Sequence, residues 1–229
     1  MNDEERLSRA ISLTQVLRAP RQALATFGVT SVEYYLVTHP VYAAGDEQET
    51  VVRRGRVVAN RPRIVTPYYL SRVEGFSADA RRYLGRLMAE HGPHAPGIYY
   101  TYRNEPGGLD IVSDNMSQVL DKINREIDEK HNPLAAIISG EDEMWDVSLM
   151  KFIFEMTSQS FGQNVTEMHS RGLLGVDADG VPQEARLRIE EMFNQLYKGA
   201  IRPGELKDEL ERWGLFEEYQ DRFLALFRR

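Results

Sequence analysis

Stretches that favour β-strands are confined mostly to the first half of the chain, and amphipathic helical stripes fill most of the rest. β-branched and aromatic residues dominate residues 32–37, which is typical of a strand. From Asn132 onward the apolar residues follow helical spacing, although 134–138 would also suit a buried strand. A run of strands followed by a run of helices indicates the α+β class. We therefore expect an α+β fold, with a mixed β-hairpin and helix part at 1–132 and an all-helical part at 133–229, sharing one core.

Helices are predicted wherever apolar residues recur every three to four positions. This spacing predicts helices at 4–18, 78–91 and 114–130, and Ser77 suits the N-cap of the second. Residues 144–156 are apolar on every side, which predicts a central helix that is buried all round.

Two β-hairpins are predicted in the first half. In the segment 50–59 we expect a two-residue turn at Arg54-Gly55, because glycine accepts the positive φ that a tight hairpin turn requires. Residues 98–103 and 109–112 predict a second hairpin around a turn rich in proline and glycine. The polar run Gly45–Glu49 predicts a loop, and 63–70 a strand broken by Pro67.

The distribution of basic residues points to a binding surface. Every basic residue among the first 103 is arginine, and the first lysine is Lys122. Arg53 and Arg56 would face each other across the first hairpin, where like charges repel, so an anion between them would be stabilising. Arginine grips carboxylates and phosphates through two parallel hydrogen bonds. With two tyrosines from nearby strands, the candidate ligand-binding residues are Arg53, Arg54, Arg56, Arg61, Arg63, Tyr68 and Tyr100.

A structural explanation competes with this functional one. A GC-rich coding bias gives 23 arginines against five lysines without any function. Residues 1–103 hold fourteen arginines and ten carboxylates, whereas residues 104–229 hold fourteen basic residues and twenty-five carboxylates. The arginines could therefore pair with the chain's own acidic half, or be solvated, and the tyrosines could belong to the core. The net charge of −7 argues against a general nucleic-acid binder.

Most familiar catalytic and metal-binding patterns are absent from the sequence. There are no cysteines, and the histidines lack the spacing of a zinc site, so we expect no metal and no cofactor. No glycine-rich phosphate loop occurs. The charged first residues, Met1 to Arg9, do not resemble a signal peptide, and no apolar run is long enough for a membrane span. We expect a cytoplasmic protein.

These observations favour a binding or regulatory protein over an enzyme. The expected partner is an acidic protein surface or a phosphate-bearing ligand, with nucleic acid disfavoured by the net charge. The alternative is an enzyme of unrecognised type, with a pocket lined by arginine and tyrosine between the sheet and the helical half. The aromatic, amphipathic C-terminal helices from Leu206 onward would suit a homo-oligomer interface, although they would equally pack on the chain's own core.

Overall fold

The computed structural model describes residues 2–41, 49–73 and 77–227. The predicted loop at Gly45–Glu49 lies outside these residues, apart from Glu49. The chain is α+β and forms two compact units, each built from two stretches of sequence. Unit 1 contains residues 1–61 and 100–165, and unit 2 contains residues 62–99 and 166–229. The predicted division of the chain, by contrast, lies at residue 132.

Unit 1 is built on a mixed five-stranded sheet with the strand order β1-β7-β2-β3-β6. Its β2 and β7 strands run parallel, and all other neighbours are antiparallel. The strands are β1 (Gln15–Arg18), β2 (Thr30–Thr38), β3 (Thr50–Ala59), β6 (Tyr102–Val112) and β7 (Ala135–Ser139). The helices are α1 (Asp3–Leu13), α4 (Met116–Glu129) and most of α5 (Trp145–Ser170).

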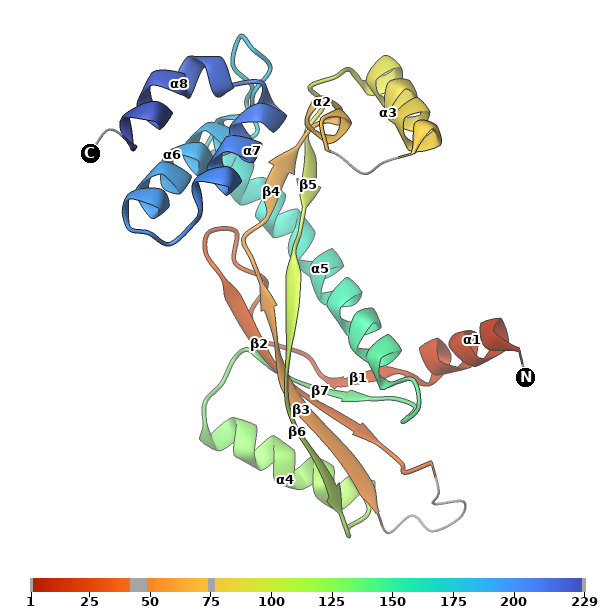
Figure 1. Ribbon diagram of the computed structural model, residues 1–229. Helices are drawn as coiled ribbons and strands as arrows, with labels where there is room; N and C mark the ends of the chain where they lie inside the picture. Colours follow the sequence, from red (N-terminus) through yellow and green to blue (C-terminus); the bar gives the residue numbers. More distant parts are fainter. Residues whose placement is uncertain (1, 42–48, 74–76, 228–229) are drawn as a thin grey trace. The chain divides into compact units, whose positions relative to one another are not determined.

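Helices α4 and α5 cover opposite faces of this sheet (Figure 1). Successive side chains of a strand point to opposite faces. On β2, Tyr34 and Leu36 pack with Phe152 of α5, whereas Tyr35 and Val37 pack with α4. The same alternation on β3 places Arg53 on the α5 side, and Arg54 and Arg56 on the α4 side.

Unit 2 combines a two-stranded sheet with a cluster of helices. Strands β4 (Arg63–Val65) and β5 (Gly97–Tyr99) pair antiparallel. The helices that lie wholly in this unit are α2 (Pro67–Ser71), α3 (Ala78–His91), α6 (Gln183–Tyr197), α7 (Pro203–Trp213) and α8 (Phe216–Ala225). Ile189, Phe193, Leu206 and Leu210 lie at the centre of its largest apolar cluster and are fully buried.

Both predicted hairpins are wrong. Segment 50–59 is the single strand β3, which pairs along its length with β2 and β6. Gly55 does not adopt positive φ. A Cβ there would lie 2.5 Å from the Tyr34 hydroxyl, so glycine is needed for a close approach and not for a turn. Residues 102–112 likewise form one strand, with a β-bulge near Pro106.

Other predicted elements are confirmed or corrected in detail. Helix α3 begins after Ser77, whose hydroxyl accepts the N–H of Ala80, and α4 lies within the predicted 114–130. The first helix ends at Leu13, because residues 15–18 join the sheet as β1. Of the two structures that suited 134–138, the structure contains the strand, β7. The predicted strand at 63–70 becomes β4 followed by α2, which begins at Pro67.

The prediction that 144–156 is buried on every side is wrong. Phe152 and Met156 of α5 are buried against the sheet, but the side chains of Met150 and Phe154 are 65% and 71% exposed. The helix is therefore a covering layer with one face outward.

Candidate functional site

Arg53 is held tightly by groups of the protein itself. Its guanidinium donates a 2.5 Å hydrogen bond to Oδ1 of Asp142 and lies 5.6 Å from the centre of the Trp145 ring. Thr38 donates to the same carboxylate. The side chains of Arg53 and Asp142 are only 16% and 17% exposed. This arginine is neutralised and stacked, so it offers little to an external anion.

Arg54 and Arg56 differ from Arg53, although they lie on the same strand. The nearest carboxylate oxygens are 3.8 Å (Asp110) and 4.0 Å (Glu126) from Arg54, and 3.6 Å (Glu105) from Arg56. These are loose ion pairs, and neither guanidinium donates a hydrogen bond to any residue that the structure describes. The two side chains are 44% and 62% exposed. Their N–H groups therefore remain available to a ligand.

Arg54 and Arg56 line an open concavity of about 490 Å³ on the α4 side of the sheet. The bulge in β6 forms one wall, with Glu105, Pro106 and Gly107. Gly107 approaches β3 so closely that a Cβ there would lie 2.9 Å from the Arg54 carbonyl oxygen. The remaining lining residues are Ser31, Glu33, Gly55 and Asn132. We call this site the sheet concavity.

Glu33 is fixed in the wall of the sheet concavity by neutral donors. The hydroxyl of Tyr35 donates to one of its carboxylate oxygens (3.1 Å), and the side-chain amide of Asn132 donates to the other (2.9 Å). Burial, followed by the charges of Glu33 and Glu126, raises the pKa of Tyr35 to about 12, so this phenol stays protonated. Among the described residues no basic group lies within 4.0 Å of Glu33.

Unit 2 contains a second cluster of charges, which is mostly buried. Glu209 is 2% exposed and accepts hydrogen bonds from Arg188 (2.9 Å), the Trp213 indole (2.9 Å) and the Tyr69 hydroxyl (3.2 Å). Burial, and then the charge of Glu209, raises the pKa of Tyr69. Arg63 of β4 lies beside this group. Burial and the charge of Arg188 lower the pKa of Arg63.

The other predicted site residues have separate surroundings. The hydroxyl of Tyr100, in unit 1, donates to Asn164, and burial raises the pKa of Tyr100 to about 12. Tyr68, in unit 2, lies beneath the guanidinium of Arg72. Arg61 is partly buried at the end of the first stretch of unit 1. Of the seven predicted residues, Arg54 and Arg56 share the sheet concavity.

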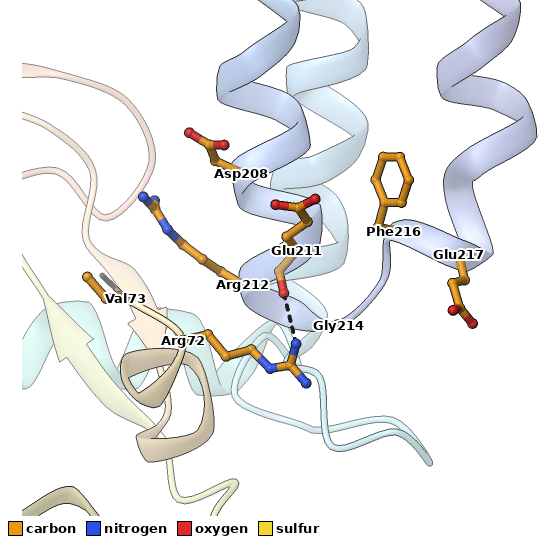
Figure 2. A pocket seen from close by; sticks show the side chains of 8 residues that line it. All are labelled: Arg72, Val73, Asp208, Glu211, Arg212, Gly214, Phe216 and Glu217. Atoms are coloured by element: carbon orange, nitrogen blue, oxygen red, sulfur yellow. Dashed lines mark hydrogen bonds between the residues drawn. The ribbon is translucent and has the colours of Figure 1, made fainter. Parts of the chain in front are cut away.

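A larger concavity, of about 890 Å³, lies between α2, α7 and α8 of unit 2 (Figure 2). Arg72 donates to the Glu211 carbonyl oxygen across its floor. Two arginines line it together with three carboxylates and Phe216. This mixture of charges selects no ligand class.

No group of three histidine, aspartate or glutamate side chains in the described part of the chain could hold a metal ion. His94 instead lies against the ring of Tyr68.

Sequence reasoning missed the residues that complete both charge clusters. Long-range packing brings these residues to the predicted arginines from distant positions in the sequence. They are Glu105, Asn132, Arg188 and Glu209. Glu33 had one usable signal, because it is the one charged residue of the strand Thr30–Thr38. Comparisons of the chain with protein-family models, curated proteins and solved structures found no match. No helix in the described residues has the length and apolarity of a membrane span.

Proposed function

We propose that the protein is a cytoplasmic binding protein that captures a carboxylate or phosphate group between Arg54 and Arg56. One observation carries this proposal: two exposed guanidinium groups line one concavity and donate no hydrogen bond to any described residue. Guanidinium groups bind carboxylates and phosphates with charge-assisted hydrogen bonds, which are roughly twice as strong as neutral ones.

The surrounding carboxylates limit what can bind. Glu105 lies 3.6 Å from Arg56, so an incoming anion displaces this loose pair. Exposed ion pairs of this kind contribute about 0–1 kcal/mol, which a charge-assisted hydrogen bond exceeds. Glu33 and Glu105 also repel an extended polyanion. The sheet concavity therefore favours a single acidic group, from a small ligand or a partner's side chain, over a nucleic-acid backbone.

Calorimetric titration with inorganic phosphate at constant ionic strength tests the proposal. We expect saturable binding to the unaltered protein. Replacing Arg54 and Arg56 together with alanine removes two charged hydrogen-bonding groups, so affinity should fall by at least about tenfold. Far-ultraviolet circular dichroism should remain unchanged, because both side chains are exposed.

The matched control replaces two exposed arginines of unit 1 that lie outside the sheet concavity, Arg21 and Arg125. This control changes the net charge by the same amount. Equal losses of affinity in the two double variants would show that only overall charge matters and would refute the proposal. Absence of any saturable binding would refute it as well. The alternative of an enzyme with a site between the sheet and the helical half stays a prediction.

A further inference from the structure

The sheet concavity contains a carboxylate without a close basic partner, that of Glu33. Glu33, Arg56 and Glu105 lie directly opposite one another on the adjacent strands β2, β3 and β6. The Arg56 guanidinium nevertheless lies 3.6 Å from Glu105, and Glu33 forms no ion pair within 4.0 Å with any described residue. We propose that the ligand is a small zwitterion, whose ammonium group binds Glu33 while its acidic group binds the arginines. This inference rests on the proposed function of Arg54 and Arg56.

The hydrogen bonds that Glu33 already accepts leave it able to bind a cation. The Tyr35 hydroxyl donates to one carboxylate oxygen and the Asn132 amide to the other, and neither donor is charged. An ionised carboxylate has about four acceptor sites, so each oxygen keeps one for a further donor. Lys130, whose charge attracts that of Glu33, donates its hydrogen bond to Glu126 instead (2.7 Å). A ligand ammonium would therefore supply the close positive charge that Glu33 lacks.

The charged lining of the sheet concavity matches a ligand that carries both signs. It consists of two arginines, Arg54 and Arg56, and two glutamates, Glu33 and Glu105. A purely anionic ligand is attracted by the arginines and repelled by both carboxylates. A zwitterion that places its ammonium at Glu33 converts one of these repulsions into an attraction. Complementary charges of this kind select one class of ligand over another.

The spacing of the strands sets the length of the ligand. Directly opposed residues on adjacent strands have Cβ atoms about 5 Å apart. Glu33 and Arg56 are such a pair, and the concavity between them is open and has a volume of about 490 Å³. We therefore expect a small molecule in which about two carbon atoms separate the acidic group from the amine. 2-Aminoethyl phosphate and β-alanine have this spacing, with a phosphate and a carboxylate as the acid.

Calorimetric titration with two matched pairs of probes, near neutral pH and at constant ionic strength, tests the inference. 2-Aminoethyl phosphate is compared with ethyl phosphate, and β-alanine with propionate, to distinguish a phosphate from a carboxylate ligand. In at least one pair the amino compound should bind at least about fivefold more tightly, through a charged hydrogen bond to Glu33. A smaller preference in both pairs overturns the zwitterion and leaves the proposed function standing. If none of the four probes binds, both fail.

Glu33→Gln assigns the preference to this residue. The change removes the charge, so the amino compound should lose its preference, to about twofold or less. Its amine-free partner should bind more tightly, because a repelling charge is gone. The control is Glu129→Gln, which makes the same change of net charge at an exposed position of α4 and should keep the preference. An unchanged preference in Glu33→Gln, or equal losses in both variants, overturns the proposal.

A measurement on the unaltered protein covers the case in which Glu33→Gln fails to fold. Carbon-13 nuclear magnetic resonance of the glutamate side-chain carboxyl groups follows Glu33 directly. Saturation with the amino compound should shift the Glu33 signal further than saturation with its amine-free partner, while the Glu129 signal stays in place. Equal shifts of the Glu33 signal with the two compounds overturn the proposal.

Discussion

Arg53, Arg54 and Arg56 lie within four residues on one strand, yet their guanidinium groups have different surroundings. Arg53 contacts Asp142 and Trp145, whereas Arg54 and Arg56 face the sheet concavity with loose partners. The sequence shows that arginines are crowded here. Once the segment is taken as a strand, the sequence also explains why Arg53 faces one side of the sheet and Arg54 and Arg56 face the other. It could not show which are neutralised, because Asp142 is 89 positions away.

Asp142→Ala tests the structural role of Arg53. It leaves a mostly buried guanidinium without its carboxylate, so the free energy of unfolding should fall by about 2–4 kcal/mol in urea denaturation. Asp146→Ala, at an exposed position in the first turn of α5, should lower it by less than about 1 kcal/mol. Equal effects would mean that the Arg53–Asp142 pair contributes nothing specific.

Glu105→Gln tests the competition for Arg56. Removing this charge frees Arg56 from its loose ion pair, so phosphate should bind about two- to fivefold more tightly, in line with the strength of exposed pairs. The control is Glu129→Gln, which makes the same charge change at an exposed position of α4. Calorimetry that shows weaker binding to Glu105→Gln would contradict the competition.

At the scale of elements, local signals predicted helices better than strand connections. Ser77 and the apolar stripe after it define α3, because capping and helical spacing are properties of neighbouring residues. β3 was missed, because Arg54-Gly55 has the composition of a hairpin turn. Whether such a glycine lies in a turn or in a strand depends on distant partners, here the Tyr34 hydroxyl and the Glu105 carbonyl.

Gly55→Ala tests that assignment. A Cβ at Gly55 would lie 2.5 Å from the Tyr34 hydroxyl and 2.8 Å from the Glu105 carbonyl oxygen. The strand must shift, so we expect a loss of about 1–3 kcal/mol in the free energy of unfolding. Gly108→Ala, on β6, meets nothing within 4 Å and should change it by less than about 0.5 kcal/mol. Similar values for both variants would indicate that Gly55 has room around it, as in an open turn.

At the scale of the whole molecule, the opposite charges of the two sequence halves are partly explained by pairing inside unit 1. Arg6, Arg18 and Arg53 each pair with a carboxylate from the second half of the chain. The sequence supported the α+β class and this possibility of internal pairing. It could not reveal units assembled from two separate stretches each, because no local pattern records which distant segments pack together.

The central claim is that Arg54 and Arg56 hold one anion together. Nuclear magnetic resonance of the arginine side-chain N–H groups, followed during a phosphate titration at constant ionic strength, tests it most directly. We predict that the signals of Arg54 and Arg56 shift with a common saturation curve, while that of Arg53, bound to Asp142, stays in place. Unchanged signals from Arg54 and Arg56, or a non-saturating drift shared by all exposed arginines, would contradict the claim.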